Sequence, residues 1–177
     1  MSAETLETAR LRLRPAKVAD APRITSLIND PGVARMSTRI PHPYALQDAE
    51  DFLTRCEAGD EKVFAIEHGD DGLVGVIGFH DAGRLGPEVG YWLGRPYWGR
   101  GLATEAARAA LAEALHAHPV TLVDGLIGAC CPQQIQDAVT AGHRVVLLVH
   151  LPLADETGLR PNQARDLEGL ERWAAHS

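Results

Sequence analysis

Two glycines that precede an alanine-rich segment constrain this chain more than any other feature of its sequence. Gly99 and Gly101 lie directly before residues 102–115, where alanine and leucine recur at the spacing of one helix face. Because glycine has no Cβ, the backbone can turn tightly here and approach a ligand closely. The first N–H groups of a helix have no partner within the helix and lie at its positive end. The sequence therefore predicts an anion-binding turn and a phosphate-bearing ligand.

Length and composition indicate a single domain over residues 1–177. The chain is 45% hydrophobic, which is enough for one core but not for two. Its 17 Lys and Arg residues against 24 Asp and Glu residues give a net charge of −7, which argues against nucleic acid and fits a cationic or amine substrate. No signal peptide or membrane-spanning run is visible. The three cysteines have no disulfide or metal spacing, so we expect a cytoplasmic protein.

Apolar periodicity predicts strands and helices around the turn. The strands expected before it are residues 11–15, 63–66, 73–79 and 88–93. We expect the last three of these to be sequential and antiparallel, because glycine-containing turns separate them. Asp20 is expected to cap a helix over 21–28, and Gly59 to end a second helix that begins at Leu46.

Beyond Pro119 the pattern changes to strand, helix and strand. The elements expected there are a strand at 120–123, a helix at 132–141, a strand at 145–149 and a modest helix around Trp173. A strand that follows a crossover helix pairs in parallel or in a mixed sheet. Together the elements predict an α/β (α+β) fold with a mixed, mostly antiparallel central sheet flanked by helices.

The string from Trp98 to Ala103 resembles the acetyl-CoA signature of the GCN5-related N-acetyltransferase (GNAT) superfamily, Gln/Arg-x-x-Gly-x-Gly/Ala. Trp98 stands where glutamine or arginine is usual. The longer string from Glu88 to Ala106, together with residues 8–15, resembles the RimJ/RimL-like branch of ribosomal-protein alanine N-acetyltransferases. This resemblance covers about residues 8–117 and implies a fold of the acyl-CoA N-acyltransferase type.

Residues 118–177 depart from the family pattern. The family has an Asn-x-x-Ser pair where this chain has Cys131 and Gln134, and a Gly-Phe pair where it has Gly142 and His143. Segments that are instead similar to part of the N-terminal Rossmann-like domain of nucleotide-sugar glycosyltransferases are residues 120–129, 146–153 and 156–159. A recombined gene and an artefact of sequencing or construction are both open explanations.

The resemblance implies a site for acetyl-CoA as co-substrate, with no metal. The residues implied in its binding are Leu93, Trp98, Gly99, Arg100, Gly101, Leu102, Ala103 and Thr104. Backbone N–H groups from Gly99 to Thr104 would bind the pyrophosphate of CoA. A backbone N–H near Leu93, where the strand would splay from its neighbour, would donate to the thioester carbonyl as the amine attacks. Arg100 is either a phosphate ligand or a solvated side chain.

Glu88 is the candidate general base. An amine is protonated near neutral pH, so a carboxylate must remove a proton before attack, directly or through water. Alternation places Glu88 on the same strand face as Gly90 and Trp92, and the alternative is a solvated glutamate at a hairpin end. Direct transfer requires no thiol nucleophile, so Cys130 and Cys131 are interpreted as core or helix-edge residues.

The function that these features predict is transfer of acetyl from acetyl-CoA to a primary amine. The acceptor would be an amine-bearing small molecule or a protein N-terminus, and no nucleic acid or membrane is expected as a partner. A homodimer is one expected assembly. Two alternatives stay open: a CoA-binding or inactive chimeric protein without turnover, and a glycosyltransferase fragment that binds a nucleotide sugar.

Overall fold

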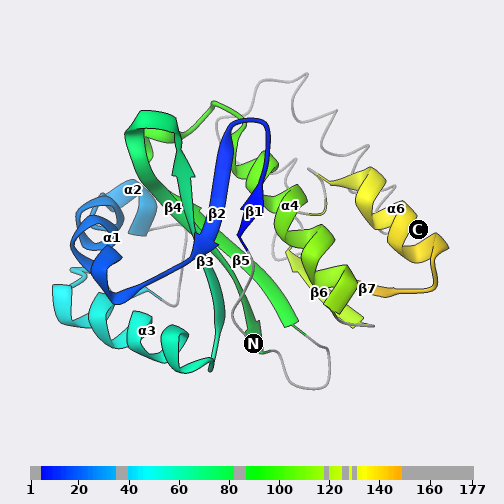
Figure 1. Ribbon diagram of the computed structural model, residues 1–177, viewed down its shortest axis with the longest axis horizontal. Coiled ribbons are helices and arrows are strands. Elements are labelled where there is room, and N and C mark those ends of the chain that lie inside the picture. The colour runs from blue at the N-terminus through cyan, green and yellow to red at the C-terminus, as the bar shows by residue number, and fades with distance from the viewer. Residues whose placement is uncertain are drawn as a thin grey trace. The chain divides into compact units, whose positions relative to one another are not determined.

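The computed structural model of the chain describes residues 5–34, 40–81, 87–117, 120–124, 128 and 131–148 (Figure 1). The chain divides into two compact units. The first unit comprises Met1–His80 and Gly90–Ala110, and the second comprises Asp81–Val89 and Leu111–Ser177. A single domain over the whole chain stays a prediction.

Antiparallel strands form the centre of the first unit. Its strands, two of which continue into the second unit, are β1 (Leu6–Glu7), β2 (Leu11–Pro15), β3 (Lys62–His68), β4 (Gly72–Asp81) and β5 (Pro87–Leu93). β2 is antiparallel to both β1 and β3, and β3 is antiparallel to β4. Gly75 lies against Leu93 while His80 lies against Gly90, so β4 and β5 also run in opposite directions. The predicted antiparallel strands are confirmed.

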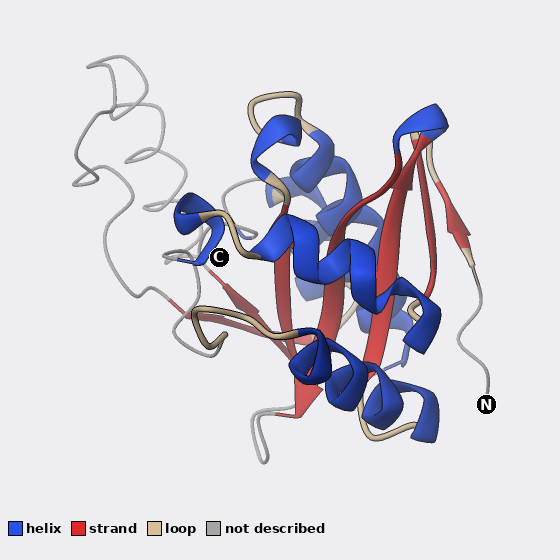
Figure 2. Cartoon of the chain, turned by 90° about the vertical axis from the view of Figure 1, so that its left-hand side faces the viewer, coloured by secondary structure: helices blue, strands red, loops and turns tan. Residues whose placement is uncertain are grey.

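Short helices of the first unit pack beside these strands. They are η1 (Val18–Asp20), α1 (Ala21–Ile28), α2 (Pro31–Ala34), α3 (Leu46–Ala58), η2 (Gly69–Asp71) and η4 (Arg95–Tyr97). α1 contacts both α2 and α3, and Figure 2 shows the helices in front of the strands. α3 ends as predicted at Gly59, whose φ of 93° is left-handed and whose N–H donates to the carbonyls of Arg55 and Cys56.

Asp20 precedes α1 as predicted, but its side chain does not cap the helix. The carboxylate instead accepts hydrogen bonds from Arg14 Nη1 and Nη2 at 2.8 and 2.7 Å and from the Lys17 N–H at 2.9 Å. Burial alone would raise the pKa of Asp20, but the bonds from Arg14 and Lys17 outweigh it and hold this pKa below 3.8. The predicted cap is wrong because a charged partner on β2 takes the carboxylate.

The core lies on both faces of β3 and β4. Residues 63–66 and 73–79 are all buried, so these two strands are covered on both sides. α4 (Leu102–Ala117) begins in the first unit and ends in the second, and it buries a stripe of mostly small side chains. Its buried residues are Leu102, Ala106, Ala107, Ala110, Leu111, Ala114 and Leu115. Such a stripe lets the helix backbone lie close to what it packs against.

Parallel strands form the second unit. It contains the start of β5, β6 (Val120–Asp124), α6 (Pro132–Thr140) and β7 (Arg144–Leu148). β5 pairs in parallel with β6 at Glu88–Leu122 and Val89–Val123, and β6 pairs in parallel with β7 along its length. The predicted strand, helix and strand are therefore confirmed. The helix predicted around Trp173 lies outside the described residues.

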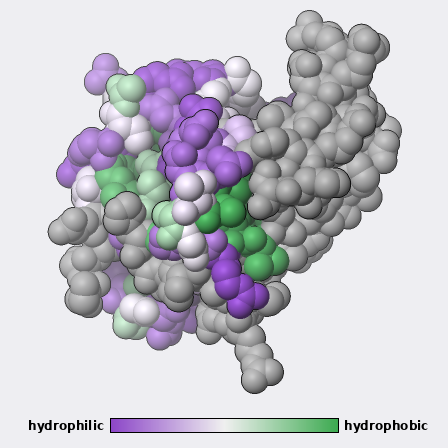
Figure 3. Space-filling view, turned by 90° about the vertical axis from the view of Figure 1, so that its right-hand side faces the viewer, coloured by the Kyte–Doolittle hydropathy of each residue, from purple (hydrophilic) through white to green (hydrophobic). Residues whose placement is uncertain are grey.

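The mixed, mainly antiparallel sheet flanked by helices confirms the predicted fold class. Within the described ranges, no helix combines the length and apolar composition needed to cross a membrane. Hydrophilic side chains cover most of the described surface that Figure 3 shows.

Candidate functional site

The chain that leaves β5 is held in place before it reaches the glycine turn. The Gly94 N–H donates to the Val74 carbonyl at 2.9 Å. A Cβ on Gly94 would lie 2.8 Å from a terminal methyl of Leu27, so a larger residue here would require the Leu27 side chain to shift. In η4, the hydroxyl of buried Tyr97 accepts a hydrogen bond from Arg23 Nη2 at 2.9 Å. These contacts fix the point at which the turn begins.

Trp98 and Leu93 lie against each other. The indole Nε1–H donates to the Leu93 carbonyl at 2.7 Å, and the tryptophan is 40% exposed. In a strand, the N–H and C=O of one residue point to the same side, and neighbouring residues alternate. Because the Gly94 N–H points to β4, the N–H and C=O of Leu93 point away from β4. Trp98 therefore lies on the side of β5 to which the Leu93 N–H points.

The predicted glycine turn adopts a left-handed backbone at both glycines. Gly99 and Gly101 have φ of 70° and 72°, a left-handed region that costs other residues about 1–2 kcal/mol. The Glu105 N–H donates to the Gly101 carbonyl at 3.2 Å, which is the first hydrogen bond of α4. The N–H groups of residues 102–104 precede this bond and so come before the hydrogen-bonded ladder of the helix.

Arg100, between the two glycines, makes an exposed ion pair. Its Nη1 lies 3.7 Å from Asp71 Oδ2, and its guanidinium carbon lies 5.9 Å from the centre of the Tyr97 ring. Asp71 also pairs with His68 Nδ1 at 2.9 Å. Both members of the Arg100–Asp71 pair are more than 40% exposed, so the pair adds little to stability. Its guanidinium can leave Asp71 at low cost.

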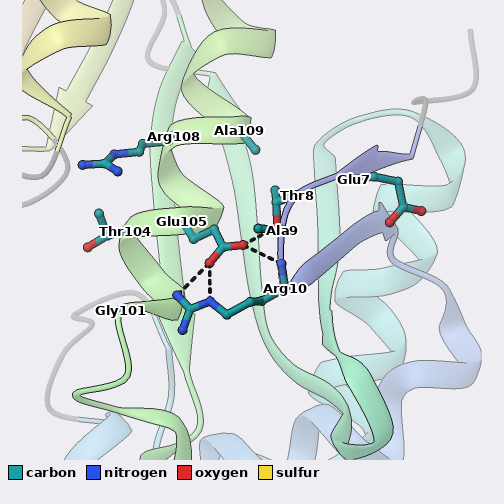
Figure 4. A pocket seen from close by; sticks show the side chains of 9 residues that line it. All are labelled: Glu7, Thr8, Ala9, Arg10, Gly101, Thr104, Glu105, Arg108 and Ala109. Carbon is teal, nitrogen blue, oxygen red and sulfur yellow. Dashed lines mark hydrogen bonds and ion pairs between the residues drawn. The ribbon is translucent and has the colours of Figure 1, made fainter.

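Glu105, in the first turn of α4, binds the turn between β1 and β2 (Figure 4). Its Oε1 accepts hydrogen bonds from the Thr8 hydroxyl at 2.6 Å and from the Arg10 N–H at 2.8 Å. Its Oε2 lies 2.7 Å from both Nε and Nη2 of Arg10. Partial burial would raise the pKa of Glu105, but these bonds from Thr8 and Arg10 outweigh it and lower this pKa below 4.5.

Arg10 also contacts the glycine turn. Its Nη1 donates to the Arg100 carbonyl at 2.9 Å. Its Nη2 would lie 3.6 Å from a Cβ on Gly101. Arg10, Gly101 and Glu105 are among the residues that line a surface pocket of about 530 Å³ between the β1–β2 turn and the start of α4. We call Thr8, Arg10 and Glu105 the Arg10 cluster.

The sequence predictions include Glu105 in the family-like string but give it no role. The position of Glu105 nevertheless indicated a role. A carboxylate in the first turn of a helix repels an anion bound there unless a cation lies beside it. The identity of that cation could not be read from the sequence, since Arg10 is 95 residues away along the chain.

The structure brings Leu93, Trp98 and residues 99–104 together in the first unit. Glu88 lies in the second unit, where it is half-buried and pairs with Leu122 in the sheet register.

Cys131 fits its predicted place in the core or at a helix edge. Cys131 is fully buried at the start of α6. Burial, together with the neighbouring Glu61 carboxylate, raises the pKa of the Cys56 thiol to about 11, so this thiol is protonated at neutral pH. Cys130 lies outside the described residues. The described residues contain no group of three His, Cys, Asp or Glu side chains arranged to hold a metal ion.

A family model described as an acetyltransferase (GNAT) domain matches residues 10–135. The chain belongs to the GNAT acetyltransferase family. The match includes β2, the glycine turn, α4 and β6 and ends within α6, so it continues past residue 117, where the resemblance visible in the sequence stops.

Two kinds of relative agree with this family. An N-acetyltransferase of Bacillus licheniformis, called p20 and itself uncharacterised, is 32% identical over 114 residues. That alignment covers 59% of this chain, and the chain spans about three fifths (62%) of the relative's length. The structure of an acetyltransferase from Agrobacterium tumefaciens is similar with a TM-score of 0.51 and 28% identity, over 80% of this chain and 82% of that one.

The ribosomal alpha-N-protein acetyltransferase RimL, solved in complex with coenzyme A, shares the fold. Its TM-score is 0.55 at 18% identity, over 64% of this chain and 69% of RimL.

Proposed function

We propose that this GNAT protein transfers the acetyl group of acetyl-CoA to a primary amine, either a small molecule or a protein N-terminus. The observation that carries the proposal is the glycine turn: two left-handed glycines lead into a helix whose first N–H groups precede its hydrogen-bonded ladder. The negative charge of the whole chain favours a cationic acceptor.

The residues of the turn fit the pyrophosphate of CoA. Gly99 and Gly101 carry no side chain that would keep a phosphate away from the backbone. The N–H groups of residues 102–104 can donate to phosphate oxygens, and the helix dipole adds a favourable positive potential. Arg100 can exchange its exposed partner Asp71 for a phosphate oxygen. The RimL complex with coenzyme A supports this assignment, since that protein has the same fold.

Leu93 and Trp98 are proposed to hold the thioester end of acetyl-CoA. The Leu93 N–H points away from β4, on the side where Trp98 lies, and would donate to the thioester carbonyl. The amine nitrogen attacks the carbonyl carbon, and the N–H stabilises the oxyanion that forms. The C–S bond then breaks, the nitrogen gives up one proton to become a neutral amide, and the leaving sulfur takes up a proton as free CoA thiol. Acetyl-CoA supplies the activated acetyl group in this step.

Glu88 is proposed as the general base that removes the proton of the ammonium form before attack. Glu88 precedes Leu93 by five positions on extended β5, which is about 16 Å along the strand. Proton removal by Glu88 therefore needs a relay of several water molecules between the amine and the carboxylate. Glu88→Gln should lower kcat at neutral pH and leave the affinity for acetyl-CoA unchanged; an unchanged kcat across pH 6–9 would contradict this role. Because the chain resembles the RimJ/RimL-like branch, protein N-termini are the first class of acceptor to test.

Two measurements test the proposed function. Acetyl-CoA and CoA should raise the unfolding temperature of the protein, whereas UDP- and GDP-sugars should not. A thiol-release assay with small amines and with peptides bearing free N-termini should then show turnover. Absence of any shift with CoA compounds would overturn the proposal. A shift without thiol release on any amine would identify a CoA-binding protein without turnover.

A further inference from the structure

Glu105 presents an electrostatic difficulty for an anion site at the start of α4. Its carboxylate lies in the first turn of the helix that is proposed to bind pyrophosphate. Alone, it would repel a phosphate and reduce the benefit of the helix dipole. Its side chain is 18% exposed, so water screens this charge only in part.

Arg10 compensates that charge. Its Nε donates to Oε2 of Glu105 at 2.7 Å and its Nη2 lies 2.7 Å from the same oxygen, so two guanidinium nitrogens face one carboxylate oxygen while the third remains for another partner. The two side chains together carry no net charge. The positive potential of the helix start is therefore left for a bound anion.

The third contact of Arg10 fixes the direction of a donor in the turn. Its Nη1 is a hydrogen-bond donor only, and it donates to the Arg100 carbonyl at 2.9 Å. In a trans peptide the C=O of one residue and the N–H of the next point in opposite directions. Holding the Arg100 carbonyl toward Arg10 therefore points the Gly101 N–H away from Arg10. Glycine at 101 allows the left-handed φ of 72° that this orientation needs.

We propose that Arg10 and Glu105 are positioning residues for pyrophosphate binding: Glu105 orients Arg10, and Arg10 directs the Gly101 N–H and neutralises the carboxylate. This inference rests on the proposed binding of acetyl-CoA. Thr8 completes the cluster, because its hydroxyl donates to Glu105 at 2.6 Å and accepts from the Leu11 N–H at 2.9 Å. The role is exerted through the backbone of the turn, so neither side chain needs to touch the ligand.

The test uses substitutions that separate charge from direction. Arg10→Lys keeps the charge but cannot hold Glu105 twice and the Arg100 carbonyl at once. It should weaken acetyl-CoA binding about 5-fold, and Arg10→Gln, which loses the charge as well, about 10-fold. The double variant Arg10→Gln with Glu105→Gln lacks the carboxylate that Arg10→Gln leaves unpaired. It should bind acetyl-CoA about 3-fold more tightly than Arg10→Gln alone. The KM for acetyl-CoA should rise in parallel, with kcat unchanged.

S-acetylpantetheine, which has the thioester but no pyrophosphate, separates positioning from general damage. Its KM should be the same for the wild type and both Arg10 variants. Arg14→Lys is the matched control, because Arg14 makes a similar pairing with Asp20 and Glu67 away from the turn. It should lower the unfolding temperature without changing the KM for acetyl-CoA.

The outcomes distinguish the two proposals. If the wild-type protein does not bind acetyl-CoA, the proposed function itself is wrong. If the wild type binds and folded Arg10→Lys and Arg10→Gln bind equally well, the positioning role is wrong. If the Arg10 variants raise the KM for S-acetylpantetheine and the KM for acetyl-CoA by the same factor, the cluster serves stability alone and the inference is overturned.

Discussion

The two ends of β2 carry the same kind of charged cluster in different surroundings. At its end, Arg14 donates to Glu67 at 2.7 Å and to Asp20 at 2.8 and 2.7 Å, and these side chains are 12–25% exposed. Just before its start, Arg10 donates to Glu105 and to the Arg100 carbonyl, and its side chain is 47% exposed. Each arginine connects three parts of the chain.

The difference lies in what each cluster connects. The Arg14 cluster links β2, β3 and the short helix η1, all of which are regular structure. The Arg10 cluster links the β1–β2 turn to α4 and to a backbone carbonyl of the glycine turn. Similar hydrogen-bonding chemistry thus stabilises the fold at one end of the strand and sets the shape of a candidate binding site at the other. Variants of the two clusters should separate stability from ligand affinity.

The largest expected effect is a loss of acetyl-CoA affinity caused by a substitution in the glycine turn. Gly101→Glu puts a carboxylate at the proposed pyrophosphate position, in a left-handed backbone that glutamate disfavours. Acetyl-CoA affinity should fall by at least about 100-fold, or about 2.7 kcal/mol, measured by titration calorimetry. Gly59→Glu is the control, because Gly59 is also left-handed with open space around it but lies at the end of α3. Tight binding by folded Gly101→Glu would show that the turn is not the site.

The next largest effect is expected on the free energy of unfolding, from a substitution in the Arg14 cluster. Arg14→Gln leaves the partly buried Asp20 and Glu67 carboxylates without their shared cation. We expect the free energy of unfolding to fall by about 2 kcal/mol in urea titrations. Acetyl-CoA affinity, measured where the variant is fully folded, should match the wild type. A loss of affinity comparable with that of Arg10→Gln would remove the distinction between the clusters.

Acid should lower the free energy of unfolding through both clusters. The pKa values of Asp20 and Glu105 in the folded protein lie below their ordinary values of 3.8 and 4.5. Each carboxylate therefore contributes stability above its ordinary value, and this contribution is lost as the pH falls through the lower folded value. Urea midpoints should drop from pH 5 downward. Glu105→Gln should flatten the part of this decline that begins near 4.5, and Asp20→Asn the part that begins near 3.8. An unchanged slope in either variant would contradict the corresponding assignment.

The smallest effect is expected at Arg100. Its pair with Asp71 is exposed at both ends, so Asp71→Asn should change the free energy of unfolding by less than about 0.5 kcal/mol. Freeing the guanidinium from Asp71 should strengthen acetyl-CoA binding about 2-fold if Arg100 contacts a phosphate. Equal affinities of Asp71→Asn and the wild type would favour the solvated interpretation of Arg100.

Local features were predictable from the sequence and distant side-chain pairs were not. Apolar periodicity predicted α3 and α4, and the two glycines predicted a tight turn before α4, because both are properties of neighbouring residues. The cap at Asp20 was predicted wrongly because Arg14 competes for its carboxylate. β1 has two residues, too few to show an alternating pattern.

Part of the candidate site was also predictable from the sequence, and part was not. The turn and the start of α4 could be found because they form one continuous string with a family pattern. The Arg10 cluster could not, because its members meet only after the fold brings β1, β2 and α4 together. The roles of Glu88 and of the acceptor groove depend on side-chain placement that periodicity does not encode.

The separation of Thr8 from Glu105 by 97 residues also bears on how the protein is made. Arg14 finds Asp20 six residues away, so this pair can form early on a growing chain. Arg10 must wait until α4 has been synthesised and has docked, which closes a far longer loop. During translation the glycine turn therefore reaches its final contacts after the strands of the first unit have formed, so a nascent chain can have these strands folded before the candidate site is complete.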